Sequence, residues 1–505
     1  MNLIKNYDIF LNIVSLSCEM LLFWCLILHI IYSCFYYFGR YYIYIQSIMC
    51  VYLYSFLLVL FMVYNLDIII SDLFGGSFII NYSDILIRNI IMILGIPLIY
   101  FSIIFINNNY SLVNIIEYTI LMYILLLATF FALYSNDMIS LFLCIELQSM
   151  VMYILICLCS TFSSISMGIR YFLLGTIVSL VFLFLFTLLY YYVGISNFID
   201  YVYISYFIDS SYFSYGMSVM YILFLFKLYI YPFHFIGGDL YRYSPIYILI
   251  VIASIIYYVY IYLFIKFVSY IYINIDLVSI SIYCTLFLAV LNILVQRDIR
   301  SFLGFGTSVH SCFLLYLLLY DSYINISMCL FYALIYIVTI IGFFILFVKY
   351  SQVTFSVYAC RNILSTKSVG LKTSYIRLHK ICLCPLEYIV AWSGINKHHK
   401  WFTFIFGILF WSISGLPPFS GFFAKLGVLM MCYLAHNMLL LVFILSISVV
   451  SSLYYLRIIK ECFYISKSRY YYATFQEFDL LVVFLVILLC LISVFLPEVL
   501  MYLFY

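Results

Sequence analysis

One carboxylate, Glu146, lies near the middle of an apolar run, residues 136–156, that is long enough to cross a bilayer. An ionisable side chain at that depth costs about 3 kcal/mol or more, so it usually faces a protein interior and has a partner. The candidate partners are two lysines in other apolar runs, Lys227 in FLFKLYIYPFHF and Lys425 in SGLPPFSGFFAKLGVL. A desolvated lysine can lose its proton and regain it when a carboxylate approaches, whereas an arginine stays charged. The three residues together indicate a proton path inside a membrane.

Two histidines are further candidates for that path, because histidine titrates near neutral pH and can relay protons. His234 follows Pro232 by two residues, and His310 lies in a later apolar run. Plainer interpretations stay open. A lone membrane histidine is often a packing hydrogen bonder, Glu146 could be held protonated by burial, and lysines can extend toward the interface as anchors.

The composition excludes a soluble protein and favours an all-α, polytopic membrane protein. Of the 505 residues, 68% are hydrophobic and 8% are charged, and the mean hydropathy is +1.22. The sixteen cysteines form no CxxC pair and read as small hydrophobes, so we expect no metal site. The sequence has no Gly-rich phosphate loop, no flavin or nicotinamide fingerprint and no haem or iron–sulfur ligand set. We therefore expect no cofactor and no nucleic-acid partner for this chain.

Fourteen apolar runs reach the length of about 20 residues that a transmembrane helix needs. They cover residues 11–38, 42–64, 84–106, 113–134, 138–159, 168–192, 215–235, 245–267, 277–295, 301–320, 324–347, 401–434, 438–459 and 480–504. Lysine and arginine concentrate in alternate loops, which predicts both termini on the outer side of the membrane. The longest loop, residues 349–400, is then a solvated inner-side loop. Glu19 is expected near the headgroups, and Asp137 is expected to cap the fifth helix.

The seventh and twelfth spans are predicted to be broken helices. Pro232 follows Lys227 by five residues, and proline removes a helical hydrogen bond. In the twelfth span, residues 415–418 read GLPP and precede Lys425. The breaks lie five spans apart, and an odd number makes a repeat of that length inverted. Similar interruptions at corresponding positions of two halves are typical of a transporter's ion site.

Several of these stretches carry a resemblance to a known family. ALYSNDMISLFLCIELQSMVMYIL resembles the fifth helix of the antiporter-like membrane subunits of proton-pumping NADH:quinone oxidoreductase, respiratory complex I. Its E-L-Q-S is similar to the branch called subunit 2 in mitochondria and subunit N in bacteria. Further resemblances lie, in the family's order, in GIRYFLLGTIVSL, FKLYIYPFHF, RDIRSFLGFGTSVH and SGLPPFSGFFAKL. The resemblance covers roughly residues 130–430.

The resemblance implies a three-helix segment over residues 1–112, two inverted five-helix halves over 113–272 and 273–465, and a last helix over 466–505. It implies that Glu146 pairs with Lys227, that His310 is the family histidine, and that Lys425 ends the charged row. FMN, iron–sulfur clusters and ubiquinone would belong to other subunits of the same enzyme. The implied partners are other membrane-arm subunits and lipids such as cardiolipin. The implied location is the mitochondrial inner membrane, with a bacterial plasma membrane as the alternative. The heavy use of Tyr, Phe and Ile suits the first, because it resembles that of proteins encoded by AT-rich organelle genomes.

Two departures from the family pattern matter. The family's central lysine in the eighth helix is missing, because the region offers Ile255, Tyr257 or Tyr258 there, and Lys266 is at the helix end. Either Tyr257 or Ser254 bridges the path with water, or coupling between the halves is weakened. The loop before the twelfth helix is also longer than usual, with an insertion over residues 351–390 that we expect to contact accessory subunits.

Two other functions compete with a proton-translocating complex I subunit. The first is a subunit of a related multisubunit cation/proton antiporter. The second is a structural module of the membrane arm that pumps nothing, which the missing eighth-helix lysine favours.

Overall fold

The computed structural model describes residues 17–38, 71–108, 115–159, 161–205, 220–270, 274–319, 323–365, 389–392, 396, 400–417 and 419–464. The predicted spans 42–64 and 480–504 and most of the predicted 351–390 insertion lie outside these residues. The chain divides into two compact units, Met1–Leu228 with Tyr243–Val278, and Tyr229–Arg242 with Ser279–Tyr505. Each is described by itself below.

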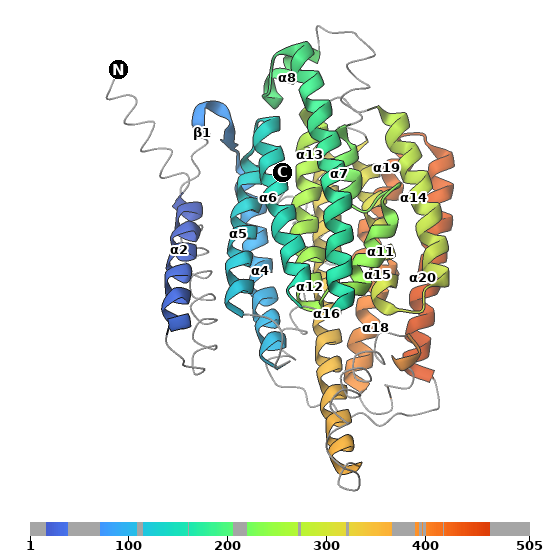
Figure 1. Cartoon of the computed structure of the whole chain (residues 1–505). Helices are drawn as coiled ribbons and strands as arrows, with labels where there is room; N and C mark the ends of the chain where they lie inside the picture. The colour runs from blue at the N-terminus through green and yellow to red at the C-terminus, as the bar shows by residue number, and fades with distance from the viewer. Residues whose placement is uncertain are drawn as a thin grey trace. The chain divides into compact units, whose positions relative to one another are not determined.

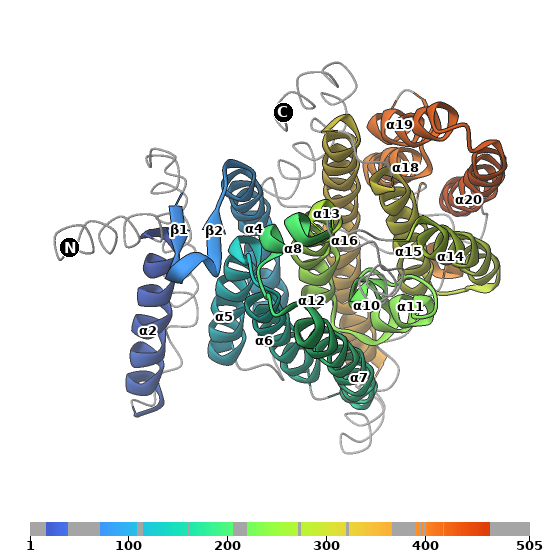
Figure 2. The same cartoon turned by 90° about the horizontal axis from the view of Figure 1, so that it is seen from above.

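The first unit is a helical layer built around α5. Its elements are α2 (Ser17–Phe38), β1 (Ser71–Leu73), η2 (Phe74–Gly76), β2 (Phe78–Ile80), α4 (Tyr82–Asn108), α5 (Ile115–Tyr134), α6 (Met138–Cys157), α7 (Phe162–Val193), α8 (Phe198–Ser205), α10 (Ile222–Lys227), α12 (Ile246–Val251), η3 (Ile252–Ile256) and α13 (Tyr257–Tyr270). Helix α5 packs against α2, α4, α6 and α13, and α6 packs against α7. Figures 1 and 2 show α4, α5 and α6 side by side.

The second unit gathers its helices around α16. Its elements are α11 (His234–Tyr243), α14 (Ile275–Val295), α15 (Ile299–Leu318), α16 (Tyr323–Ser365), η5 (Ile389–Trp392), α18 (Lys400–Ser414), α19 (Ser420–Leu434) and α20 (Met438–Tyr464). Helix α16 packs against α15, α18 and α19, and α20 packs against α18 and α19. This arrangement brings the middle of α15 close to α19.

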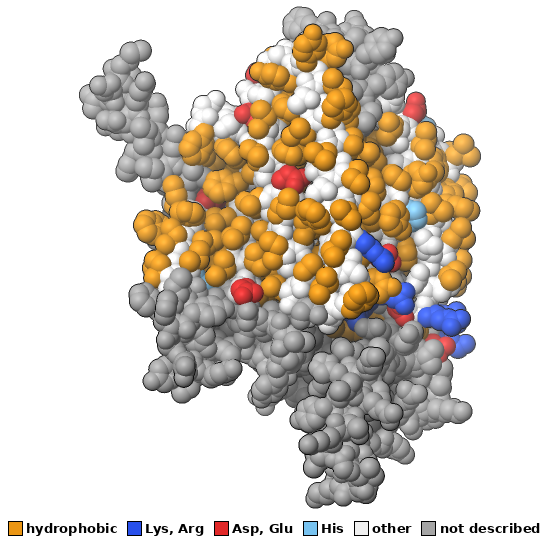
Figure 3. Space-filling view, viewed as in Figure 1, with side chains coloured by type: hydrophobic (Ala, Val, Ile, Leu, Met, Phe, Trp, Pro, Cys, Tyr) orange, Lys and Arg blue, Asp and Glu red, His pale blue; other side chains and the backbone are white. Residues whose placement is uncertain are grey.

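The membrane character predicted from composition agrees with the helices. Among the described residues, eight helices are long and apolar enough to cross a bilayer. Only 28% of the most apolar window of α7 is buried, and its outward side chains include Leu180, Phe184 and Tyr191. Hydrophobic side chains cover most of the face in Figure 3 that includes α6 and α7. Such a surface is stable in hydrocarbon and costly in water.

A small hairpin departs from the all-α prediction. Strands β1 and β2 pair antiparallel, with Ser71 opposite Ile80. The turn between them places Gly75 at φ 70° and Gly76 at φ 89°. Positive φ is available to glycine at little steric cost, so the adjacent glycines allow this reversal. Asn136 donates its backbone N–H to Ser77 O at 2.9 Å, which ties the hairpin to the loop before α6.

Three local expectations from the sequence are wrong. Helix α16 continues to Ser365, so the first part of the predicted 349–400 loop is helical, and in Figure 1 α16 runs past the lower end of α18. Glu19 is buried, at 2% exposure, because Arg88 pairs with it, so it does not face headgroups. Asp137 occupies the N-cap position of α6, but its side chain makes no capping hydrogen bond. Burial and the nearby Asp200 carboxylate raise the pKa of Asp137.

Helix α11 is fixed to α15 by direct backbone contact. A Cβ added at Gly304 would lie 2.6 Å from Gly237 O, so only glycine allows the two helices to approach so closely. Arg242 Nε and Asp298 Oδ2 form an ion pair at 2.8 Å across the same two helices. The helix that follows the first break is thereby held in place inside the second unit.

Candidate functional site

The first helix break directly follows a buried lysine. Helix α10 ends at Lys227, residues 228–233 are not helical, and α11 begins at His234. Tyr229 within the break has φ 58°, a left-handed conformation that a helix cannot continue through. The predicted interruption near Pro232 is present and begins four residues before the proline, directly after Lys227.

Lys227 is 6% exposed, and its nearest described surroundings are aromatic. Its Nζ atom lies 5.4 Å from the ring centre of Tyr260 on α13, 5.6 Å from that of Phe226, and 5.8 Å from that of Tyr171 on α7. Rings at these distances attract a cation through their negative faces.

Glu146 is half-buried on α6 and interacts electrostatically with Lys227. Ser149 Oγ donates to Glu146 O at 2.8 Å and lies 3.4 Å from Glu146 Oε2. Among the described residues, no ion pair joins the Glu146 carboxylate to the Lys227 ammonium. Tyr153, two turns further along α6, interacts electrostatically with Glu146 and with Tyr260. Tyr153 therefore lies near Glu146, and Tyr260 lies near Lys227.

The second break brings another lysine to a helix end. Helix α18 ends at Ser414, Gly415 has φ 73°, and α19 begins at Ser420. Lys425 Nζ donates to Ser414 O at 2.8 Å. The last carbonyls of a helix lack intrahelical partners and carry partial negative charge, so they stabilise a cation. The break thus supplies Lys425 with a partner that a continuous helix would not offer.

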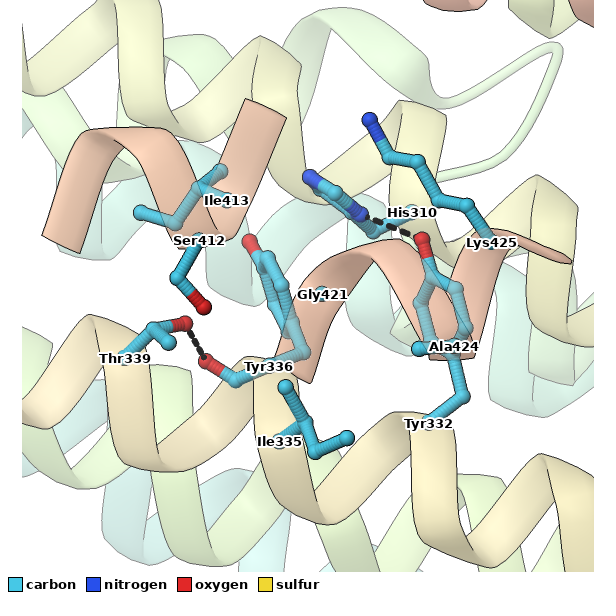
Figure 4. A pocket seen from close by; sticks show the side chains of 10 residues that line it. All are labelled: His310, Tyr332, Ile335, Tyr336, Thr339, Ser412, Ile413, Gly421, Ala424 and Lys425. Carbon is cyan, nitrogen blue, oxygen red and sulfur yellow. Dashed lines mark hydrogen bonds between the residues drawn. The ribbon is translucent and has the colours of Figure 1, made fainter. Parts of the chain in front are cut away.

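His310 shares a small cavity with Lys425 in the second unit (Figure 4). Its Nδ1 atom hydrogen-bonds the Tyr332 hydroxyl at 2.7 Å, and its ring centre lies 4.4 Å from that of Tyr336. The cavity measures about 10 Å³ as space open to the centre of a water molecule, close to the minimum that one water needs. Ser412 and Thr339 add hydroxyls to its lining. The arrangement can hold a hydrated link between the imidazole and the ammonium.

Comparison with known proteins identifies the family of the chain. Residues 135–451 match the family described as NADH:quinone oxidoreductase/Mrp antiporter, TM. This chain belongs to that family. Over 362 residues it is 28% identical to NADH-ubiquinone oxidoreductase chain 2 of Rhizopus oryzae, covering 70% of this chain and 65% of the relative, just under two thirds. It is 27% identical over 362 residues to NADH-quinone oxidoreductase subunit N of Wolbachia sp. subsp. Brugia malayi, covering 68% and 69%.

Solved structures share the fold. A chain of an archaeal membrane-bound sulfane sulfur reductase superposes with a TM-score of 0.79 at 17% identity, over 98% of this chain and 96% of that one. A chain of respiratory complex I from Thermus thermophilus gives 0.74 at 15% identity, over 96% and 98%. A chain of the Mrp complex from Dietzia sp. gives 0.71 at 15% identity, over 90% and 81%. At these identities the likeness concerns the fold alone.

His234 differs from the other predicted residues of this family member. It begins α11, is half-buried, and its ring interacts with the backbone of Pro232. Its described ring neighbours are Tyr231 at 6.3 Å and Phe235 at 6.1 Å between centres. Within the described part of the second unit it contacts neither His310 nor Lys425.

The region of the predicted eighth helix contains a π-helical turn, η3 (Ile252–Ile256). Ile255 is 1% exposed there, and Ser254 Oγ donates to Ile250 O at 2.6 Å. Lys266 forms an ion pair with Asp84 at 2.9 Å and also donates to Leu133 O. The described residue of this helix that meets Lys227 is Tyr260, which the sequence did not single out.

Tyrosines line both lysine sites, and sequence reasoning missed all of them. They are Tyr153, Tyr171 and Tyr260 in the first unit and Tyr332 and Tyr336 in the second. With 57 tyrosines in the chain, residue type alone carried no signal. The one local clue is spacing, because residues seven apart on a helix, as Glu146 and Tyr153 are, share a face.

Tyr332→Phe tests the support of His310. Because the substitution removes the hydroxyl at 2.7 Å from Nδ1 and little else, we expect a loss of about 1 kcal/mol, or roughly five-fold in the population of the oriented imidazole. The NMR signals of the His310 ring, which report its orientation, measure this change. Tyr433→Phe, on the exposed face of α19, is the matched control and should leave these signals unchanged. Equal signals in both variants would contradict a role for the hydrogen bond.

Proposed function

We propose that this chain is a proton-translocating membrane-arm subunit of NADH:quinone oxidoreductase, driven by electron transfer in other subunits. Protons move by way of Glu146 and Lys227 in the first unit and His310 and Lys425 in the second, and His234 is a candidate relay beside the first break. FMN, iron–sulfur clusters and ubiquinone belong to the other subunits. The enzyme acts as the H⁺-translocating NADH:ubiquinone reductase, to which this chain contributes proton movement.

The observation that carries this proposal is a lysine at each of two helix breaks, of which Lys227 is buried and Lys425 is half-buried. Lys227 is the last residue of α10, and Lys425 donates to the last residue of α18. A stably charged lysine without a close carboxylate is costly inside a membrane, so a structural role alone gives little reason to retain two. A lysine that alternates between charged and neutral forms benefits from the same apolar environment, because desolvation makes its proton easier to release.

A proton step at each lysine follows from its neighbours. In the first unit the Lys227 ammonium gives a proton toward the Glu146 carboxylate, which leaves a neutral amine and a neutral acid. In the second unit His310 exchanges a proton with Lys425 across the small cavity. Neutralisation removes a charge from the interior, so each step changes the electrostatic energy of the next group in the row.

The architecture and location are part of the same proposal. Spans 4–8 and 9–13 form two inverted halves, in a chain of fourteen spans. The Rhizopus relative favours the mitochondrial inner membrane, and the bacterial relatives keep a plasma membrane as the alternative. The partners are other membrane-arm subunits, membrane lipids such as cardiolipin, and accessory subunits at residues 351–390.

Glu146→Gln and Lys425→Met test the function in the assembled complex. Each removes one ionisable group with little change in size. We therefore expect NADH oxidation to continue while fewer protons are pumped for each NADH oxidised. The measurement is protons translocated per NADH oxidised in sealed vesicles. Lys460→Met, at an exposed position near the end of α20, is the matched control. Normal stoichiometry in both site variants would reject proton translocation and leave a structural module.

A cation/proton antiporter subunit is the second candidate, because the matched family covers Mrp antiporters and the Mrp complex from Dietzia shares the fold. Both relatives named above are NADH oxidoreductase subunits, which favours the first candidate. Affinity purification of the full chain distinguishes them. Recovery with flavin and iron–sulfur subunits supports the oxidoreductase, and recovery in an assembly without them supports the antiporter.

A further inference from the structure

Lys227 differs from the ion-paired cations that the structure describes. Arg88 lies 3.1 Å from Glu19, Lys266 lies 2.9 Å from Asp84, and Arg242 lies 2.8 Å from Asp298. Lys227 instead has three rings within 5.8 Å of Nζ, while its electrostatic partner Glu146 has Ser149 close to its carboxylate. The resting place of this ammonium is therefore aromatic.

The rings around Lys227 are held by one another. Tyr171 stacks on Phe226, with centres 5.4 Å apart and planes 12° apart. Tyr153 meets Tyr171 edge-on at 5.1 Å, and the Tyr153 hydroxyl packs directly over Gly175 of α7, where no side chain would fit. Tyr260 is 2% exposed on α13, which packs against α10. The rings of Tyr171, Phe226 and Tyr260 are together called the aromatic cage below. Rings that are already held in place attract a cation without having to move.

We propose that Tyr171 and Tyr260 are positioning residues whose ring faces hold the charged form of Lys227 between proton transfers. This inference rests on the proposed function and adds a second resting place to it. Between transfers the protonated Lys227 side chain lies against these rings. It then gives a proton to Glu146, so that an N–H bond breaks, an O–H bond forms, and both groups become neutral. A neutral amine gains little from the rings, so the cage favours return of the proton from Glu146 or from the next donor.

The ionisable groups that face Lys227 come from three elements. Glu146 and Tyr153 lie on α6, Tyr171 lies on α7, and Tyr260 lies on α13. Of these groups only Glu146 carries a carboxylate, and the other three are phenols. A pH effect that depends on the rings can therefore be separated from one that depends on the carboxylate.

Tyr171→Leu and Tyr260→Leu, each in the assembled complex, test the cage. Without a ring face the ammonium is less stable, so it deprotonates at lower pH. The measurement is the rate of proton pumping as a function of pH. We expect the fall in rate on the alkaline side of this profile, its alkaline limb, to occur about one pH unit lower in each variant. Tyr171→Phe and Tyr260→Phe keep the ring and should restore the limb. Phe264→Leu, which changes an aromatic residue on α13 that packs against Phe224, is the matched control and should leave the profile in place.

Three outcomes would overturn the cage. The limb could stay unchanged in the Leu variants, it could shift equally in the Phe variants, which would assign the effect to the hydroxyls, or it could shift equally in Phe264→Leu. If a Leu variant fails to assemble, Tyr260→Met fills the same space with a flexible side chain and gives the same readout. Lys227→Met separates this inference from the function. Normal pumping in that variant rejects the function, whereas lost pumping with unshifted Leu variants rejects the cage alone.

Discussion

Arg88→Met is expected to destabilise the chain by about 3–5 kcal/mol, because it leaves a buried carboxylate without its cation. Arg88 Nη1 lies 3.1 Å from Glu19 Oε1 and 2.9 Å from the Tyr134 hydroxyl, which itself donates to Glu19 Oε1 at 2.7 Å. The side chains of Arg88 and Glu19 are only 4% and 1% exposed. The midpoint of thermal denaturation and the amount of assembled chain measure the loss.

The double variant Arg88→Met/Glu19→Gln is the decisive control. Removing both charges avoids the unpaired carboxylate, so we expect most of the lost stability to return. Arg242→Met, whose side chain is 42% exposed in its pair with Asp298, should cost about 1 kcal/mol or less. If Arg88→Met denatured like the unmodified chain, the pair would contribute nothing to the packing of α2 against α4 and α5.

The same pair shows where sequence reasoning ends. Glu19 and Arg88 are 69 residues apart, and hydropathy reports only that each lies near the end of an apolar run. Such positions are equally suitable for contact with headgroups. Lys266 and Asp84 are likewise distant in sequence and meet only in the fold. Which charge finds which partner depends on helix packing, and no local pattern encodes it.

Local signals were far more informative at the breaks. Pro232 and the GLPP motif act on the backbone within one turn, so their effect is readable from the sequence, and both predicted interruptions are present. The chain's membership of its family was likewise carried by local motifs, which fall within the matched residues 135–451 or close to their start. The predicted spans 113–134 and 277–295 coincide closely with α5 and α14. The roles predicted for Glu146, Lys227, His234, His310 and Lys425 await the experiments above.

Gly421→Ala is expected to disable the second lysine site. A Cβ at this position would overlap the backbone carbonyl of Ser412, which cannot move as a flexible side chain could. The last turn of α18 and the first turn of α19 must then separate, at a cost of about 1–3 kcal/mol. That displacement pulls Lys425 away from Ser414 O and opens the cavity beside His310. Protons pumped per NADH should fall as far as in Lys425→Met.

Gly407→Ala on α18 is the matched control for this second prediction. A Cβ there meets only Phe463 Cε2 at 3.7 Å, an ordinary contact, and alanine favours a helix interior by about 1 kcal/mol over glycine. The control should therefore pump normally and denature no earlier. Gly421→Ala leaves every ionisable group in the chain. If pumping is lost in Gly421→Ala but not in Gly407→Ala, Lys425 therefore needs its hydrogen bond to Ser414 O at the end of α18. Normal pumping in Gly421→Ala would show instead that the lysine works without that carbonyl.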